Sequence, residues 1–445
     1  PQYPKPCAQQ LMQGCGHGRI VCVVGELGCD ARTFLQPARQ MMKHPGRGQE
    51  DQDSTGGAST SPQRAQERPT ILFTAFEPSG DAHAAPVIRE LLRREPGIRI
   101  FASGGPQMQQ AGATLIERTV ESSAMGLEAL NRSLILRKHV KRIKRWASQH
   151  RVVAHVPVDS PAANFPISKA MRSAGARIIH LVAPQMWAWG RWRIAKLRRL
   201  TSVVLCLMPF EEQWFTERRV PAKFIGHPSI NRTLKLEDLR ERMHGLPQGA
   251  PRLALFPGSR SQEVRANVRL LADVYNELQD RHAGMRGVIV ATDPRMARII
   301  HKKVKVFPTG LHMITGFADA VIAWCDLALA VSGTITLDIA LQRKPMIGVY
   351  KTGWLSWLGA KLMLRTSYRL LPNIIAEREI VPEFVPYAGG PMPIVKQATR
   401  FLLDSKNAAV QSEELHRVCL RFANHNPAEE AARIILRVIQ QGGMK

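Results

Sequence analysis

The sequence first shows a strand and a helix in residues 70–92, which read TILFTAFEPSGDAHAAPVIRELL. Residues 71–76 form a short apolar run, residues 78–81 are turn formers, and residues 84–92 repeat apolar side chains at helical spacing. A strand that leads through a turn into a helix is the unit of parallel sheets covered by helices. This stretch therefore predicts an α/β fold beginning near residue 70.

The same unit returns along the rest of the chain. Further strands are expected at residues 99–102, 152–158, 177–182, 203–207, 253–256, 287–291, 327–331 and 345–349, each followed by a turn and a helical pattern. The segment 246–252 carries two prolines and a glycine between two series of comparable size. We therefore expect two Rossmann-like domains, at residues 69–248 and 249–445 with terminal helices, whose parallel sheets face an inter-domain cleft.

Residues 1–68 have a different composition from the rest. They are rich in Gly, Gln, Pro and Ser, and residues 46–68 hold almost nothing apolar with which to form a core. We expect a disordered or spurious N-terminal extension. Eight basic and six acidic residues lie in it, so about +24 of the formal +26 belongs to the remaining chain.

The positive charge predicts attraction to phosphate groups on nucleotides, nucleic acid or an anionic membrane surface. Nucleic acid is not the expected partner, because the sequence has no zinc pair, recognition-helix motif or aromatic RNA-binding signature. No apolar run approaches the ~18 to 20 residues of a membrane-spanning helix, and no secretory signal begins the sequence. These features favour a cytoplasmic protein whose membrane contact is peripheral.

The seven cysteines predict neither a disulfide scaffold nor a metal site. Cys7, Cys15, Cys22 and Cys29 are spaced by seven or eight residues, unlike the close pairs of structural zinc sites, and the other three are isolated. We expect no metal.

Two polar loops of the first series follow predicted strands, where doubly wound folds bind ligands. The first loop offers Glu77, Asp81 and His83 to bind hydroxyl groups, although Asp81 would serve equally as a helix cap. In the second loop, Asp159 follows the strand at residues 152–158 and is a candidate to accept a proton from an attacking hydroxyl. An acid at a strand end is more often a turn or cap residue, so both interpretations stay open.

Two loops of the second series are suited to phosphate. Gly258, Ser259 and Arg260 form a small-residue turn with a guanidinium at a helix start, which favours a diphosphate. Ser332, Gly333 and Thr334 offer amides at another helix start, and Asp338 follows one turn later, where it can accept hydrogen bonds from ribose hydroxyls. An ordinary capped helix is the alternative for each loop.

Two basic stretches with apolar faces, residues 125–146 and 354–371, are typical of interfacial helices. Packing faces with solvated charges explain them equally well.

Taken in order, these motifs resemble the lipid-A-disaccharide synthases, which are inverting glycosyltransferases of the GT-B architecture. The resemblance covers nearly everything from residue 70 onward. Its most telling elements are Trp187-Ala188-Trp189, Gly226-His227-Pro228 and Leu371-Pro372-Asn373. They are accompanied by Glu77-Pro78-Ser79-Gly80-Asp81, Asp159-Ser160-Pro161 with Asn164, Pro209-Phe210-Glu211, Pro257-Gly258-Ser259-Arg260 and Ser332-Gly333-Thr334.

The resemblance implies transfer from UDP-2,3-diacylglucosamine to 2,3-diacylglucosamine-1-phosphate through a β-1,6 linkage, with release of UDP and without metal or cofactor. It assigns UDP to Arg260, Ser332, Gly333, Thr334, Asp338 and Asn373. It assigns the acyl-sugar acceptor to the first domain, with Glu77, Trp187, Trp189 and Arg193. It also implies work at the inner face of the cytoplasmic membrane and is compatible with a homodimer that no local motif requires.

The sequence departs from the family pattern at several positions. Ala162 stands where the family has a second Asp, a candidate general base, and the remaining candidates are Asp159, Asp81, His83 and Glu128. Phe76 replaces a glycine, Asp338 a glutamate and Pro386 a glutamine. A different acceptor, or binding of nucleotide sugar or lipid without turnover, is therefore the alternative.

Overall fold

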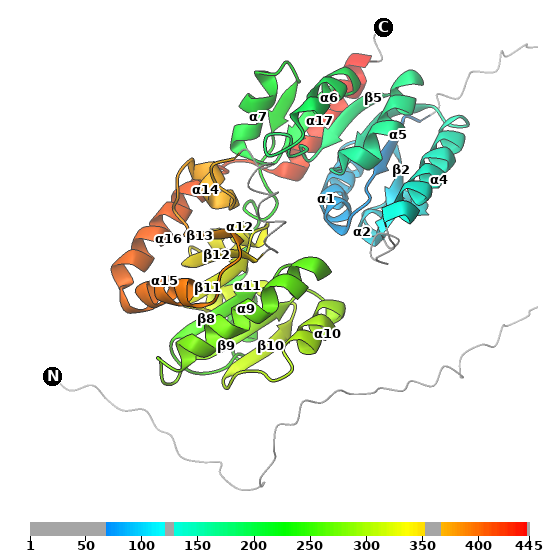
Figure 1. Cartoon of the computed structure of the whole chain (residues 1–445). Helices are drawn as coiled ribbons and strands as arrows, with labels where there is room; N and C mark the ends of the chain where they lie inside the picture. The colour runs from blue at the N-terminus through cyan, green and yellow to red at the C-terminus, as the bar shows by residue number, and fades with distance from the viewer. Residues whose placement is uncertain (1–67, 121–128, 352–365, 443–445) are drawn as a thin grey trace, which may run out of the picture. The chain divides into compact units, whose positions relative to one another are not determined.

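A computed structural model describes residues 68–120, 129–351 and 366–442 (Figure 1). Residues 1–67 of the predicted extension at 1–68 lie outside these ranges, as do Glu128 and most of the basic stretch 354–371. Within the described ranges no helix is long and apolar enough to cross a membrane. The same ranges contain no group of three His, Cys, Asp or Glu side chains suited to a metal ion.

The first sheet has seven parallel strands in the order β3-β2-β1-β4-β5-β6-β7. Its strands are β1 (Thr70–Thr74), β2 (Arg99–Gly104), β3 (Thr114–Arg118), β4 (Val152–Pro157), β5 (Arg177–Leu181), β6 (Val203–Cys206) and β7 (Ala222–Phe224). The helices between them are α1 (Pro78–Arg94), α2 (Pro106–Gln110), α4 (Ala129–Ala147), α5 (Pro161–Ser173), η1 (Arg191–Arg193), α6 (Ile194–Leu200) and α7 (Pro209–Thr216).

The second sheet has six parallel strands in the order β10-β9-β8-β11-β12-β13. Its strands are β8 (Arg252–Phe256), β9 (Arg286–Ala291), β10 (Leu311–Thr315), β11 (Leu327–Val331), β12 (Met346–Lys351) and β13 (Glu383–Tyr387). The helices from here to the C-terminus are α8 (Leu236–Met243), α9 (Ser261–Gln279), α10 (Pro294–Lys303), α11 (Ala318–Trp324), α12 (Ile335–Leu341), α14 (Leu371–Ala376), α15 (Met392–Leu403), α16 (Ser405–Leu420) and α17 (Pro427–Gly442).

The alternation of strand and helix confirms the predicted α/β class with two Rossmann-like sheets. Central strands such as β1 and β11 are buried along their whole length, because helices cover both faces of a parallel sheet. The prediction missed β3, β7, β10 and β13, which are the edge strands of the two sheets. Edge strands need no continuous apolar run, so hydrophobic pattern alone detects them poorly.

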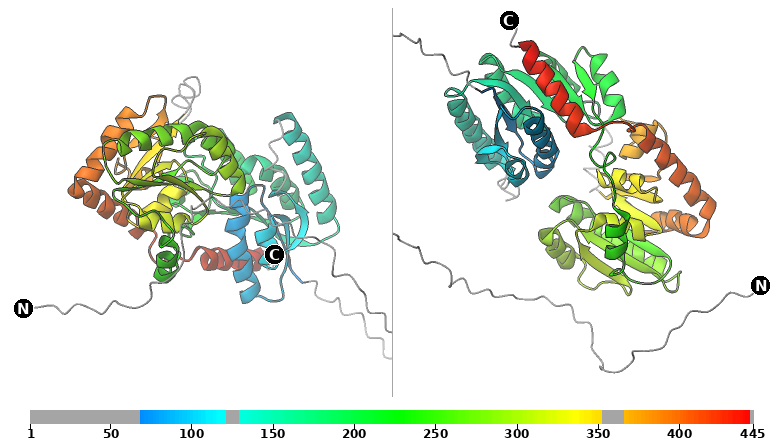
Figure 2. Two further views of the ribbon diagram at one scale, coloured as in Figure 1. Left: turned by 90° about the horizontal axis from the view of Figure 1, so that it is seen from below. Right: turned by 180° about the vertical axis from the view of Figure 1, so that it is seen from behind.

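The last helix returns to the first sheet. α17 packs against α1 and β5, and its side chains Ala431, Ala432 and Ile435 belong to the core on that side of the sheet. Figure 1 and the rear view in Figure 2 show α17, in red, beside the strands of the first sheet. This packing differs from the expectation that residues 249–445 all belong to the second domain. The boundary after residue 248 falls between β7 and β8 and stays a prediction.

The chain passes between the sheets twice, once between β7 and β8 and once between α16 and α17, and the two connections contact each other. The side-chain amide of Asn231 donates to the Phe422 carbonyl over 2.7 Å. The Phe224 ring lies edge-on to the rings of Phe422 and His425, with centroids 5.8 and 4.6 Å away. Both connections therefore form one packed joint.

Candidate functional site

Strand order reverses at one point in each sheet, between β1 and β4 and between β8 and β11. In open α/β sheets ligands bind beyond the carboxyl ends of the strands at this point. Glu77 follows β1, Asp159 follows β4, Arg260 follows β8 and Ser332 follows β11. The topology therefore places four predicted site residues where each sheet is built to bind a ligand.

Residues from the two sheets meet at Glu77. The Ser160 hydroxyl donates to Glu77 Oε1 over 3.4 Å, and the Arg260 guanidinium lies 3.8 Å from Glu77 Oε2. Both ion-pair partners are partly exposed, with 44% of the Glu77 and 72% of the Arg260 side chain accessible. A pair this exposed adds little stability, so the guanidinium stays available to an incoming anion.

Asp159 and Ser160 lie in a strained turn. Both have left-handed backbone conformations, with φ of 45° and 40°, which non-glycine residues rarely adopt. The Asp159 amide donates to the Leu181 carbonyl over 2.9 Å. Asn164, buried in α5, donates to the carbonyls of Val158 and Asp159 over 3.1 and 2.8 Å. Strain of this kind persists where surrounding bonds enforce it, typically at functional sites.

A buried polar network supports Asn164 from below. The Thr74 hydroxyl donates to Asn164 Oδ1 over 2.6 Å and lies 2.8 Å from His155 Nε2. Ser168 on α5 lies 3.5 Å from the other ring nitrogen of His155. The network thus joins β1, β4 and α5 beneath the Asp159 turn.

We expect Asn164→Ala to loosen this turn. The change removes the donor to the carbonyls of Val158 and Asp159 and leaves the Thr74 hydroxyl with His155 alone, which should lower the free energy of unfolding by about 3 kcal/mol. Because Asp159 is then less well oriented, kcat should fall about tenfold while KM changes little. Urea unfolding and steady-state kinetics check both effects. Ser168→Ala, on the same helix but without a bond to the turn, is the control; an equal loss of kcat in it would contradict the account.

Asp159, predicted as a base, is a partly buried carboxylate. Burial raises its pKa, a hydrogen bond from the Ser160 amide opposes the rise, and the charge of Glu77 adds to it. A carboxylate with a raised pKa is a stronger base once ionised.

Asp81, also predicted as a base, has a different role. It is 1% exposed, and its carboxylate accepts the amides of Gly105, Gln107 and Met108 over 3.0 to 3.1 Å. Three amide donors hold the loop that begins α2 and leave Asp81 committed to structure. A carboxylate that is buried and accepts three amides favours this structural role over the predicted catalytic one.

His83 projects from α1 and meets another histidine. Its ring lies edge-on to His227, with centroids 6.1 Å apart. Burial lowers the pKa of His83 to about 4 and that of His227 to about 3, so both rings are neutral at physiological pH. A neutral His83 can offer or accept a hydrogen bond but adds no positive charge to the site.

Two further buried histidines make the stability depend on pH. His155 and His180 are fully buried on β4 and β5, and burial lowers their pKa values to about 3 and 4. Unfolded histidines have a pKa of 6.5, so between pH 6.5 and 4 the unfolded chain binds protons that the folded chain excludes. The free energy of unfolding therefore rises with pH through this window. The stability that the two neutral histidines contribute is lost as pH falls through it.

We expect His180→Leu to weaken this acid sensitivity. Neither ring nitrogen of His180 has a hydrogen-bond partner among the described residues, so leucine should cost under about 1.5 kcal/mol at pH 7.5. The loss of stability between pH 6.5 and 5 should shrink by about 2 kcal/mol, at about 1.4 kcal/mol per unit for one proton. Urea unfolding at the three pH values measures it. The exposed His312→Leu should keep the full dependence; the same dependence in His180→Leu would refute the argument.

Glu211 was not among the predicted site residues. It is 3% exposed, accepts the Trp187 indole N–H over 2.9 Å, and accepts the amides of Leu207 and Met208 over 3.1 and 3.0 Å. Burial raises its pKa to about 7, and the charge of Asp159 contributes to the rise. Glu211 thus anchors the Trp187 loop close to Asp159. The sequence offered Glu211 only as part of the Pro209-Phe210-Glu211 motif, and no spacing indicated that its carboxylate is buried against Trp187.

The Trp187 loop presents an aromatic and basic surface. Trp187 itself is buried, whereas Trp189 is 45% and Trp192 75% exposed. The Arg193 guanidinium stacks over the Trp189 ring, 4.0 Å from its centroid. Predicted acceptor residues Trp189 and Arg193 therefore lie together at the surface, and Trp187 supports them from inside.

The turn after β8 differs from the expected phosphate cradle. The Glu263 carboxylate accepts the amides of Ser259 and Arg260 over 3.1 and 3.2 Å, and Arg260 Nη1 lies 3.0 Å from its other oxygen. These two amides are thus occupied by a protein carboxylate, which leaves the guanidinium as the group available to a phosphate. Gly258 has φ of 110°, and a Cβ there would lie 2.7 Å from that of Glu263, so only glycine suits the turn.

The turn after β11 is more open. Gly333 and Thr334 are exposed, and Ser332 donates to the Arg369 carbonyl over 3.1 Å. Asp338 in α12 accepts from Arg232 over 3.0 Å, and the same guanidinium binds both oxygens of Asp319 over 2.6 Å. Burial raises the pKa of Asp338, and the charge of Arg232 opposes the rise. Asp338 keeps a lone pair for a hydroxyl, but Arg232 orients it.

Asn373, predicted as a UDP ligand, is fully buried. Its amide donates to Val381 and Glu383, and its oxygen accepts the amides of Ile380 and Val381, all within 2.9 Å. These four bonds occupy the hydrogen-bonding groups of the Asn373 side chain within the protein. Asn373 thus shapes the loop between α14 and β13, and its contact with UDP stays a prediction.

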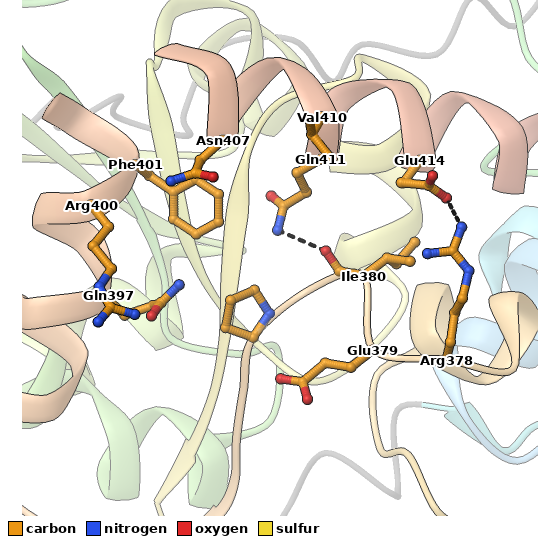
Figure 3. Close-up of a pocket in the computed structure, with 11 residues that line it drawn as sticks. Arg378, Glu379, Ile380, Gln397, Arg400, Phe401, Asn407, Val410, Gln411 and Glu414 are labelled. Carbon is orange, nitrogen blue, oxygen red and sulfur yellow. Dashed lines mark hydrogen bonds and ion pairs between the residues drawn. The ribbon is translucent and has the colours of Figure 1, made fainter. Parts of the chain in front are cut away.

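A separate pocket of about 420 Å³ lies between α15, α16 and the segment before β13 (Figure 3). Arg378 pairs with Glu414 across it, and Gln411 donates to the Ile380 carbonyl over 3.0 Å. The charges in its wall balance, with two arginines and two glutamates, and it contains none of the predicted site residues. We assign it no part in the chemistry.

The fold has counterparts among solved structures. A glycosyltransferase of kitacinnamycin matches with a TM-score of 0.57 and 15% identity, over 83% of this chain and 99% of that one. The S. aureus MnaA structure with UDP matches with a TM-score of 0.56 and 11% identity, over 84% and 96%. At these identities the likeness concerns the fold alone, which is GT-B.

Sequence relatives identify the family. Residues 71–435 match the family model of lipid-A-disaccharide synthetase. The chain is 31% identical to the lipid-A-disaccharide synthase of Pseudomonas paraeruginosa, over 82% of this chain and 98% of the relative. It is 32% identical to that of Anaeromyxobacter dehalogenans, over 83% and 97%. The chain therefore belongs to the lipid-A-disaccharide synthase family, which are hexosyltransferases of lipid A biosynthesis.

Proposed function

We propose that this chain transfers 2,3-diacylglucosamine from its UDP derivative to 2,3-diacylglucosamine-1-phosphate, forming a β-1,6 bond and releasing UDP. The observation that carries the proposal is the meeting of Glu77, Asp159 and Ser160 from the first sheet with Arg260 from the second. This juxtaposition puts a base of raised pKa beside a cation for the leaving group.

In this mechanism the acceptor 6-hydroxyl attacks the anomeric carbon of the donor. Its proton passes to the Asp159 carboxylate as the new carbon–oxygen bond forms. The bond between the anomeric carbon and the UDP oxygen breaks on the opposite face, so the configuration inverts. Arg260 then shifts from Glu77 to the diphosphate and offsets its growing negative charge.

Ala162 explains why the base is Asp159. It lies in the exposed first turn of α5, just past the strained turn, and carries no group that could accept a proton. Asp81 is committed to backbone amides, and Glu211 is enclosed behind Trp187. Among the described candidate bases of the first sheet, Asp159 is the one that is partly accessible and lies in the strained turn, whereas Glu77 beside it pairs with Arg260.

The exposed Trp189 and Trp192, with the partly buried Arg193 stacked on Trp189, suit contact with an anionic membrane, from which a diacyl substrate has to be drawn. Cytoplasmic localisation at the inner membrane face accords with this contact. The homodimer stays a prediction.

The proposal is tested by identifying the product. Purified protein with both substrates should give one disaccharide whose anomeric proton has the coupling of a β linkage and whose linkage carbon is C6. If another acyl-sugar gives product and 2,3-diacylglucosamine-1-phosphate gives none, the proposed acceptor is wrong and the other acyl-sugar takes its place. Donor binding without product from any acceptor would favour a binding protein.

A further inference from the structure

A small apolar cavity lies next to Asp159, at the carboxyl ends of β5, β6 and β7. It has a volume of about 160 Å³. Apolar side chains make most of its wall, including Val87 of α1, Leu207, Ile225 and Ala428 at the start of α17. Of the described residues that form the wall, none is Asp, Glu, Lys or Arg, and the polar side chains are His83, Asn231 and Asn426. Such a wall excludes charged ligands and favours hydrocarbon.

The backbone connects this cavity directly to the reaction point. Leu181 and Val182 line it, and the Leu181 carbonyl accepts the amide of Asp159 over 2.9 Å. One backbone hydrogen bond therefore joins the wall of the cavity to the Asp159 turn.

Val182 adopts a conformation that needs explanation. Its φ is 66°, in the left-handed region, which a β-branched residue almost never occupies. This strain costs about 1 to 3 kcal/mol and is characteristic of ligand sites. The left-handed residue belongs to the cavity wall, so the strain and the cavity are independent observations at one place.

The size of the cavity indicates the ligand. A dry cavity of about 150 Å³ lined by Leu, Ile and Phe binds benzene, so this space accommodates about six carbon atoms. That is too small for a sugar with its hydroxyls hydrogen-bonded and too apolar for a phosphate. A saturated hydrocarbon chain fits both limits.

We propose that this cavity binds part of one acyl chain of the acceptor and so makes the enzyme sensitive to acceptor chain length. The inference rests on the proposed function, because it takes an acyl-sugar acceptor next to Asp159. Burial of about two methylenes changes affinity by about tenfold, so even partial occupation of the cavity would be measurable.

The test fills the cavity from its rim. Ala428→Phe places a ring at the start of α17, where Ala428 is only half-buried and can take a larger side chain. KM for the natural long-chain acceptor should rise at least tenfold, while KM for a 2,3-diacetyl acceptor stays unchanged. The chain length of the donor should have no influence. Ala409→Phe, at an exposed position of α16, is the matched control and should behave like the unmodified protein.

A second variant guards against a folding defect. Val182→Gly removes part of the wall and suits the left-handed backbone, so it should stay folded and weaken only the long-chain acceptor. An equal loss for both acceptors, a dependence on donor chain length, or no change would overturn the proposal. If the unmodified protein turns over neither acceptor, the proposed function fails instead, so the two failures are distinguishable.

Discussion

Asp159→Asn should lower kcat about 1,000-fold, the range expected when a positioned general base is removed. The amide has nearly the shape of the carboxylate, so KM for both substrates should stay within about threefold. Stopped-flow or coupled measurement of UDP release gives both constants. The exposed Asp273→Asn on α9 controls for loss of one negative charge and should retain full activity.

The pH profile distinguishes a base from a binding residue. Burial raises the pKa of Asp159 above its usual 3.8, so kcat/KM should fall as pH drops through that raised value, because the protonated carboxyl cannot accept the proton. This acidic limb should disappear in the residual activity of Asp159→Asn. Glu211→Gln should keep the limb, since Glu211 is predicted to orient Trp187. A limb that persists in Asp159→Asn would assign the base elsewhere.

Arg260→Ala should lower kcat about 100-fold, because removal of one preorganised group that stabilises leaving-group charge costs about that much. The loss of donor affinity in the ground state should be smaller than the loss in kcat, since the guanidinium is exposed and already pairs weakly with Glu77. Arg260→Lys should recover only part of the loss, because an ammonium lacks the planar fork that matches a diphosphate.

A matched variant separates this effect from bulk charge. Arg269 is exposed on α9, the helix that begins directly after Arg260, so Arg269→Ala removes the same charge away from the point where strand order reverses. It should leave kcat unchanged. If Arg269→Ala and Arg260→Ala lose activity equally, the positive charge of the whole protein, and not the position of Arg260, would govern donor binding.

The parts of the fold that could be predicted from sequence are those with a continuous apolar run. Strands such as residues 253–256 and 327–331 are buried on both faces and therefore carry such a run. The four edge strands and the return of α17 to the first sheet could not be read this way. Their positions depend on contacts between distant segments, such as Ala431 and Ile435 with α1.

The sequence predicted which loops lie at the candidate site but not the contacts that their side chains make. Strand ends directed attention to Glu77, Asp159, Arg260 and Ser332, and the structure places these residues at the two points where strand order reverses. The sequence could not show that Asp81 and Asn373 form their hydrogen bonds inside the protein. A polar residue in a loop can bond to the backbone or to a ligand equally well. Likewise, the sequence could not show that the Glu263 carboxylate accepts the amides expected to bind a phosphate, because residue spacing does not give the position of a side chain.

The central claim is that Asp159 activates an acceptor hydroxyl beside Arg260. Its most direct test is a single-turnover measurement of UDP release with excess protein, with and without 2,3-diacylglucosamine-1-phosphate, for the unmodified protein and Asp159→Asn. The account predicts rapid release that requires the acceptor and is about 1,000-fold slower in the variant, with donor binding retained. Acceptor-dependent release at an unchanged rate in Asp159→Asn would contradict it.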